Sequence, residues 1–156
     1  MSFAERTTSS VERSKADIEK LLSRYGATKF ASGWDDGEAH LGFCIASRTI
    51  RFVLPLPNKA DDQFQLTPAG RRKRHPEDAE RAWEQGCRSR WRALLLVIKA
   101  KLEAAEVGIS TIEDEFMAWT VLPGNRGRTI GEILRPQIEE AVASGKVAPL
   151  LLGGGA

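Results

Sequence analysis

The chain has 156 residues, of which 42% are apolar and 28% are charged, and its formal net charge is +2. This length suits one domain with a substantial hydrophobic core, and the composition excludes a disordered or fibrous protein. No run approaches the roughly 18 apolar residues that a membrane-spanning helix requires, and the first residues lack the apolar segment of a secretory signal. We therefore expect a single cytoplasmic domain over residues 1–156, without membrane contact and with frayed ends at 1–8 and 153–156.

The N-terminal segment has the pattern of an amphipathic helix. Ser9 and Glu12 have the spacing of a capping box, and Gly26, directly after Tyr25, suits the left-handed residue that ends many helices. The apolar residues recur with helical spacing, at Val11, Ile18, Leu21, Leu22 and Tyr25. This pattern predicts a helix from Ser9 to Tyr25 that packs on the rest of the domain.

Three β-strands are predicted next, at residues 29–34, 38–46 and 49–54, with turns at 35–37 and 47–48. Their inward-facing positions alternate with polar or small residues, and they are Ala39, Leu41, Phe43, Ile45, Ile50, Phe52 and Leu54. The opposite face of the sheet is expected to face solvent or to be thinly covered. The three strands form an antiparallel meander in this prediction.

The composition changes over residues 58–75, where polar and turn-forming residues precede a basic run from Arg71 to Arg74. Loops of this length are uncommon, and they are usually functional or disordered. We interpret residues 58–75 as a mobile basic loop, within which residues 63–66 can add a short edge strand.

Residues 76–109 are predicted to form a long amphipathic helix, because apolar side chains recur on one flank of it. At about 100° per residue, the apolar stripe consists of Trp83, Cys87, Trp91, Leu94, Ile98, Leu102, Ala105 and Ile109. Four cations fall on a second arc roughly 110° away, namely Arg81, Arg88, Arg92 and Lys99. We expect the apolar stripe to pack on the sheet and the basic stripe to face solvent.

Two further helices are predicted in the C-terminal part, because Ser110 with Glu113 and Thr129 with Glu132 have capping-box spacing. Pro136 lies inside the second helix and is expected to kink or split it. The elements together predict an α+β domain, with an N-terminal helix, a three-stranded antiparallel meander, a long central amphipathic helix and C-terminal helices. The apolar tail at 147–152 is expected to dock on this chain or on another copy, which favours a homo-oligomer.

Positive charge is concentrated in residues 71–101, where ten lysines and arginines and four acidic residues give +6, while the remainder of the chain carries −4. This asymmetry predicts an anionic partner for one surface, although a solvated helix beside a charged loop has the same pattern. Arginine dominates the segment, which favours bidentate contacts with phosphates. The stripe on the long helix is about 27 Å long. The predicted nucleic-acid-binding residues are Arg71, Arg72, Lys73, Arg74, Arg81, Arg88, Arg92 and Lys99.

A small acidic cluster allows a different chemistry. Asp35, Asp36, Glu38 and His40 are metal-ligand types within six residues, and they would suit a metal-dependent nuclease. The same Asp-Asp-Gly sequence is also ordinary hairpin-turn chemistry. We favour the turn, because no second carboxylate cluster completes a metal site.

Two tryptophans and both cysteines are assigned to the core. Trp83 and Trp91 can stack on nucleobases, as in single-strand binders, but their positions on the apolar stripe favour core packing. Cys44 and Cys87 fall in patterns that predict burial, and reduced thiols suit a cytoplasmic protein better than a disulfide. We find no arrangement typical of a catalytic triad or a phosphate-binding loop, so we expect no enzymatic activity, no metal and no cofactor.

Three segments, GWDDGEAHLGF, RTIRFVLPLP and RWRALLLVIKAKLEA, resemble small proteins encoded by bacteriophages and prophages. The β-β-β-α order also resembles the core of Rad52-type single-strand annealing proteins, in which a hairpin and a helix border a basic groove. This second resemblance is one of element order alone, without a shared motif. Together with the basic segment, it implies a non-enzymatic protein that binds single-stranded DNA in phage recombination or replication. The alternative is a phage-encoded inhibitor or adaptor that binds a host protein through a helical surface.

Overall fold

The computed structural model describes residues 8–146 and has the predicted α+β architecture. Residues 1–7 and 147–156, on which most of the predicted frayed ends and the apolar tail fall, lie outside the described residues. In chain order the elements are α1 (Val11–Arg24), β1 (Thr28–Asp35), β2 (Glu38–Ile45), β3 (Arg48–Pro55), α2 (Asp62–Gln65), α3 (Pro76–Glu106), α4 (Ile112–Glu115), the 3-10 helix η1 (Met117–Trp119) and α5 (Ile130–Ser144).

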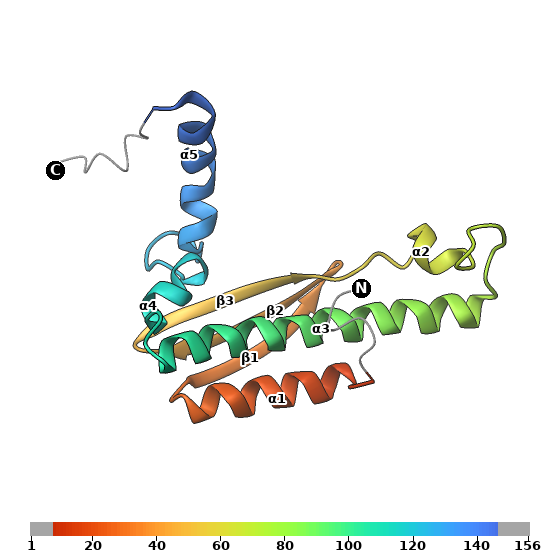
Figure 1. Cartoon of the computed structure of the whole chain (residues 1–156), viewed down its shortest axis with the longest axis horizontal. Helices are drawn as coiled ribbons and strands as arrows, with labels where there is room; N and C mark the ends of the chain where they lie inside the picture. Colours follow the sequence, from red (N-terminus) through yellow and green to blue (C-terminus); the bar gives the residue numbers. More distant parts are fainter. Residues whose placement is uncertain (1–7, 147–156) are drawn as a thin grey trace.

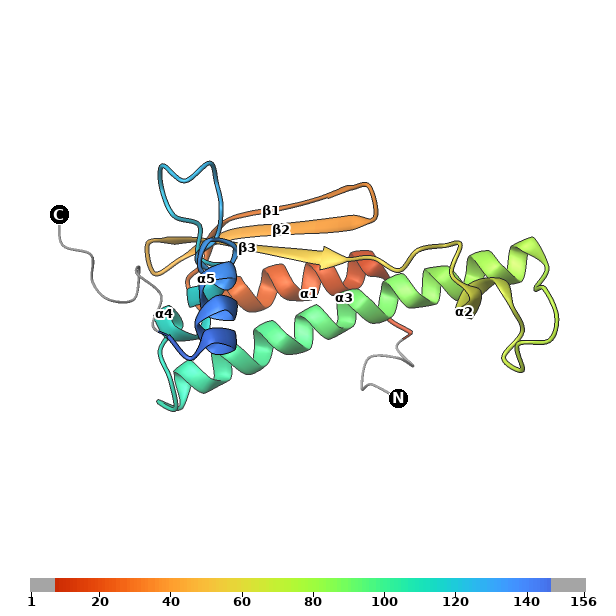
Figure 2. The ribbon, with the colours of Figure 1, turned by 90° about the horizontal axis from the view of Figure 1, so that it is seen from above.

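The strands form an antiparallel sheet in the order β1-β2-β3, and α1 and α3 cover one of its faces (Figure 1, Figure 2). The two helices run side by side in the same direction, since Lys15 lies over the ring of Trp91 and Tyr25, just after α1, bonds to Glu106 at the end of α3. The core between the layers includes the fully buried Ile18, Leu22, Leu41, Phe43, Ile50, Ile98 and Leu102. The alternation predicted for β2 and β3 is confirmed by this burial.

The second hairpin turn differs from the prediction by one residue. Ile45 pairs with Arg48, so Ala46 and Ser47 form the two-residue turn, rather than Ser47 and Arg48. Both turn residues have positive φ, 48° and 60°, as a two-residue hairpin of this kind requires. Neither residue is glycine or asparagine, so the sequence did not mark which two residues adopt this conformation.

Two predicted helix caps are also wrong by one residue. Ser10, not Ser9, caps α1, and Thr111, not Ser110, caps α4. In each case two hydroxyl residues are adjacent, and the later one accepts a hydrogen bond from the backbone N–H three positions on. The capping box at Thr129 is confirmed, with both of its hydrogen bonds present.

The segment between β3 and α3 has more structure than a mobile loop implies. The helical turn α2 replaces the edge strand predicted at 63–66, and a bridge joins Leu66 to Lys73. Phe64 of α2 packs on Gly86 of α3, where an added Cβ would lie 3.0 Å from the phenyl ring. The glycine therefore permits a close approach that a side chain would block.

The long helix α3 is continuous through Gly86, as predicted (Figure 2). Its apolar flank is buried from Cys87 to Leu102 against the sheet and α1. The helix ends at Glu106, so Ile109 lies beyond it and is 80% exposed, contrary to its predicted place on the apolar stripe.

The chain after α3 turns back to close one end of the core, and the helix predicted there is reduced to the four-residue α4 and the 3-10 turn η1. α4 ends at Glu115, and the fully buried Phe116 follows it. The ring of Phe116 contacts those of Phe43 and Phe52 edge-on, with centroids 5.8 Å and 6.2 Å apart. Trp119 stacks on Phe52 at 5.0 Å, so these rings fix the path of the chain between α4 and α5.

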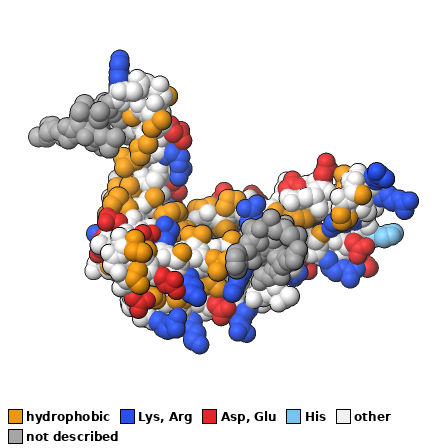
Figure 3. Space-filling view, viewed as in Figure 1, with side chains coloured by type: hydrophobic (Ala, Val, Ile, Leu, Met, Phe, Trp, Pro, Cys, Tyr) orange, Lys and Arg blue, Asp and Glu red, His pale blue; other side chains and the backbone are white. Residues whose placement is uncertain are grey.

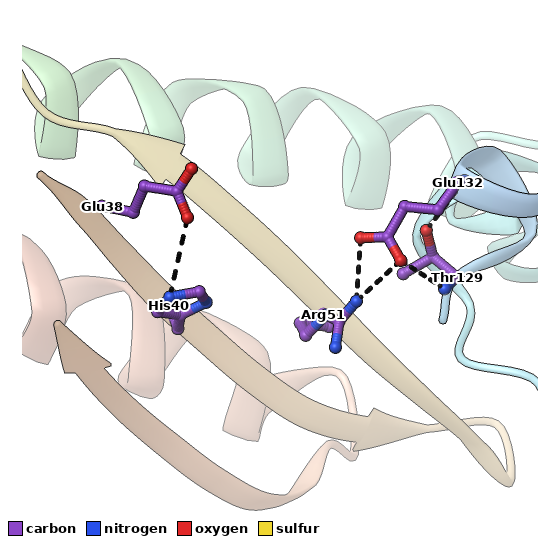
Figure 4. Close-up of polar contacts among 5 residues, drawn as sticks. All are labelled: Glu38, His40, Arg51, Thr129 and Glu132. Carbon is purple, nitrogen blue, oxygen red and sulfur yellow. Dashed lines mark hydrogen bonds and ion pairs between the residues drawn. The ribbon is translucent and has the colours of Figure 1, made fainter. Parts of the chain in front are cut away.

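The last helix, α5, projects away from the two layers and is attached to them at its first turn (Figure 1). Both carboxylate oxygens of Glu132 accept hydrogen bonds from Nη2 of Arg51 on β3, at 2.8 Å and 2.9 Å (Figure 4). Gly131 allows close contact with η1, since a Cβ there would lie 2.9 Å from the carbonyl oxygen of Ala118. The helix continues past Pro136, so of the two predicted effects, a kink or a split, the split does not occur.

Candidate functional site

The basic stripe predicted on α3 lies on the flank of that helix next to α1. Arg81, Arg88, Arg92 and Lys99 all retain solvent exposure. Nη1 of Arg92 lies 3.8 Å from Oδ2 of Asp17 on α1. The stripe therefore runs along the seam between two helices, and α1 contributes to the same surface.

A groove of about 280 Å³ opens at this seam, and its charged lining is mostly basic. α3 contributes Arg92 and Lys99, α1 contributes Lys20 and Arg24, and Asp17 is the one carboxylate among the lining residues. We call these four cations the basic groove. Lys20 and Arg24 are absent from the predicted set, although their i, i+4 spacing on one flank of α1 was a signal that could have included them.

The predicted cations at residues 71–74 lie beyond the N-terminal end of α3, in the segment that joins α2 to it (Figure 1). Backbone hydrogen bonds hold this segment in a narrow loop against the end of α2. α2 packs on Gly86, whereas Arg88 follows two residues later and so points about 200° away around the helix. A second group of cations therefore lies apart from the basic groove. We call it the basic loop, and it consists of Arg71, Arg72, Lys73 and Arg74.

Most of the predicted cations are not neutralised by carboxylates of the chain. Nη2 of Arg81 lies 2.8 Å from Asp78, in an exposed pair one helical turn apart, and Arg92 has the longer contact described above. Arg88 donates to the neutral amide oxygen of Gln85. Over residues 8–146, no ion pair involves Arg71, Arg72, Lys73, Arg74, Arg88 or Lys99.

The surface view agrees with two separate groups of positive charge. Figure 3 shows Lys and Arg side chains along the margin formed by α1 and a second group at the end of the molecule beyond α2. From Pro76 to Arg92 the axis of α3 advances by about 24 Å. The two groups are therefore joined by a rigid element that keeps their separation constant.

The two tryptophans assigned to the core have different environments. Trp91 is 3% exposed and belongs to the core, as predicted. Trp83 is only partly buried: its Nε1 donates to the carbonyl of Pro57 at 2.8 Å, and Lys59 lies 4.5 Å from its ring centroid. Trp83 therefore holds the segment after β3 against α3 rather than filling the core.

Both cysteines are free thiols in the structure. Cys87 is buried, and burial raises the pKa of its thiol, which keeps it protonated and unreactive at neutral pH. Cys44, contrary to the prediction, is only half-buried and lies on the outer face of the sheet, where its Sγ lies 3.6 Å from Oγ1 of Thr49.

The acidic turn does not assemble a metal site. Nε2 of His40 lies 3.9 Å from a carboxylate oxygen of Glu38 on the outer face of β2 (Figure 4), while Asp36 and Gly37 form the hairpin turn. In the part of the chain that the structure describes, no three or more His, Cys, Asp or Glu side chains gather where they could hold a metal ion. The metal-dependent nuclease has no assembled ligand set at this turn.

Comparison with known proteins finds no matching protein family, no matching curated protein and no matching solved structure. None of the helices in residues 8–146 has the length and apolar character needed to cross a membrane.

Proposed function

We propose that this protein binds single-stranded DNA without enzymatic activity, in the phage recombination or replication setting that its sequence resemblances suggest. The observation that supports the proposal most directly is the basic groove, in which Lys20 and Arg24 of α1 lie across one seam from Arg92 and Lys99 of α3. Since Asp17 is the one carboxylate of the lining, the groove has excess positive charge. A polyanion that neutralises such a surface releases its counterions, which favours binding.

The basic loop supplies a second set of contacts at the other end of α3. A flexible single strand can follow both sets of cations along the helix, whereas a duplex would have to match a separation that the rigid α3 keeps fixed. The two sets combine arginines, which make bidentate phosphate contacts, with lysines, which act as point charges. These features favour a single strand over a duplex as the ligand.

Fluorescence anisotropy with a labelled oligo(dT) of about 20 nucleotides tests the proposal at low salt. We expect the double variant Lys20→Ala/Lys99→Ala to weaken binding about tenfold. Replacing all four cations of the basic loop by alanine should weaken it at least as much, and both proteins should keep the wild-type unfolding midpoint. Arg135→Ala removes an exposed cation of α5 and is the matched control. Equal affinity of all four proteins, or no binding by the wild type, contradicts the proposal.

A second candidate function is protein binding through α5. None of its residues is buried, and Ile138 and Val142 are 46% and 79% exposed. Figure 3 shows hydrophobic side chains following this projecting helix. The occupant that we propose is a second copy of the chain, because the exposed Ile138 and Val142 lie one helical turn apart on one flank of α5, so two α5 helices can cover each other's apolar flank.

Size-exclusion chromatography with light scattering measures the molar mass in solution and so tests whether the chain dimerises through α5. We expect a dimer for the wild type and a monomer for Ile138→Glu/Val142→Glu, because burying a carboxylate in the interface is costly. Ile109→Glu changes an equally exposed residue outside α5 and should remain dimeric. A monomeric wild type, or a dimer that survives the double substitution, excludes pairing through α5.

A further inference from the structure

Trp34, at the end of β1, is 81% exposed, the largest exposed fraction among the large apolar side chains of residues 8–146. Its cross-strand partner Ala39 is buried, and cross-strand partners lie on the same face of a sheet. Trp34 is therefore on the face that the helices cover, but at an open margin where no helix reaches its ring. An indole in this position contributes little to the core, and its uncovered ring face is accessible to a ligand.

The ring of Trp34 does not stand alone. It lines an open cavity of about 440 Å³ between the end of the sheet, the first turns of α1 and the middle of α3. Trp83 and Trp91 line the same cavity, so three of the four tryptophans in the sequence meet there. We call it the tryptophan cavity. Only Trp34 offers a largely uncovered ring face to a ligand.

The charged groups around the tryptophan cavity balance one another. Lys15 and Arg88 line it together with Glu12 and Glu84. Lys15 lies 4.9 Å from the ring centroid of Trp91, and Arg88 donates to an amide rather than to a carboxylate. A purely apolar occupant would remove water from two carboxylates and two cations without replacing their hydrogen bonds. A planar ring with polar edges matches this lining better.

We infer that the tryptophan cavity is a base-stacking subsite for single-stranded DNA, with a nucleobase on the ring of Trp34 and the adjoining phosphate beside Arg88. This inference rests on the proposed function and adds to it the contact that selects single strands. Arg88 connects the two surfaces, because it lines the cavity and lies one helical turn, about 6 Å, from Arg92 of the basic groove. Every nucleobase has a π-face, so such a subsite needs no particular sequence.

Two oligonucleotides of equal length separate this inference from the proposed function: oligo(dT), and an abasic strand with the same phosphates but no bases. We expect the wild type to bind oligo(dT) about tenfold more tightly than the abasic strand. Trp34→Ala should lose this difference and keep the wild-type affinity for the abasic strand. Trp34→Phe should keep part of the difference, because a smaller ring still stacks. Ile109→Ala, at a similarly exposed residue, is the control and should behave as the wild type.

The outcomes are distinct. Wild-type binding of both strands with equal, salt-dependent affinity overturns the stacking subsite and leaves the proposed function intact. Wild-type preference for oligo(dT) that survives in Trp34→Ala also overturns the assignment to Trp34. Failure to bind either strand contradicts the proposed function itself. A wild-type dimer that Trp34→Ala dissociates would mean that a second copy occupies the cavity, which overturns the inference as well.

Discussion

At the scale of single residues, the contact between Arg51 and Glu132 attaches α5 to the sheet. Desolvation by burial raises the pKa of the Glu132 carboxyl. The hydrogen bond from the Thr129 N–H lowers this pKa, as do the hydrogen bond and the charge of the Arg51 guanidinium, and together they outweigh the effect of desolvation. The pKa of Glu132 therefore lies below its ordinary value. Both side chains of the ion pair are about one-third exposed, 34% and 35%, so solvent screens the pair and its contribution to stability is modest.

Glu132→Gln keeps an oxygen for the capping box but removes the charge that faces Arg51. Because the folded-state pKa is lowered, the carboxylate stabilises the fold fully above its unfolded-state pKa near 4.5, and this stabilisation is lost as pH falls through the folded-state pKa. We expect the variant to lose about 1 kcal/mol of unfolding free energy at neutral pH and less at about pH 3. Urea unfolding at both pH values measures this, and a loss of equal size at both would contradict the electrostatic cause.

Single residues are also where prediction from the sequence was least accurate. Ser9 and Ser10 have the same capping chemistry, and only the backbone geometry of the folded chain selects Ser10. Ala46 and Ser47 adopt positive φ because the register of two strands leaves two residues between them, not because of their own preferences. In both cases the local sequence allows two nearly equivalent choices of cap or turn residue, and contacts with the rest of the fold select one of them.

At the scale of elements, Gly86 links α3 to the segment that precedes it. A glycine inside a helix costs about 0.5–1 kcal/mol relative to alanine, so its presence in the middle of α3 needs a compensating contact. The rings of Phe64 and Pro57 supply it, since both lie 3.0–3.1 Å from the position of an added Cβ. The missing side chain thus allows α2 to dock on α3.

Gly86→Ala should therefore destabilise the protein by about 1–2 kcal/mol, although alanine is the better helix former. The added methyl group forces Phe64 away from the helix, and α2 should become more accessible to proteolysis. Chemical unfolding and limited proteolysis measure the two effects. Ser89→Ala, one turn further along the same helix, is the control and should not destabilise. A more stable Gly86→Ala protein would show that the close contact is unimportant.

The regular elements could be predicted because their periodicity is simple. Alternation over 38–46 and 49–54 located β2 and β3 within one residue, and the helical recurrence after Pro76 located α3. The short elements could not be predicted in this way. α2 and η1 exist because Phe64 and Phe116 reach buried positions that other segments create.

At the scale of the whole molecule, the basic groove is a product of packing. Its two halves lie on helices that are about 70 residues apart in sequence, and α1 and α3 bring them together by running side by side. The sequence indicated the cations of α3 and of the basic loop, but not the contribution of Lys20 and Arg24. It also contained no sign that Trp34 would be exposed beside Arg88, because burial depends on which elements cover the sheet margin.

The salt dependence of oligo(dT) binding tests the central claim most directly. Each phosphate that a cation neutralises on a single strand contributes about −0.7 to the slope of log Kobs against log salt concentration. With about eight contacts from the basic groove and the basic loop, we predict a slope of about −5 to −6, reduced by about 1.4 in Lys20→Ala/Lys99→Ala. A slope near zero, or a double variant with the wild-type slope, would contradict binding of DNA phosphates by these cations.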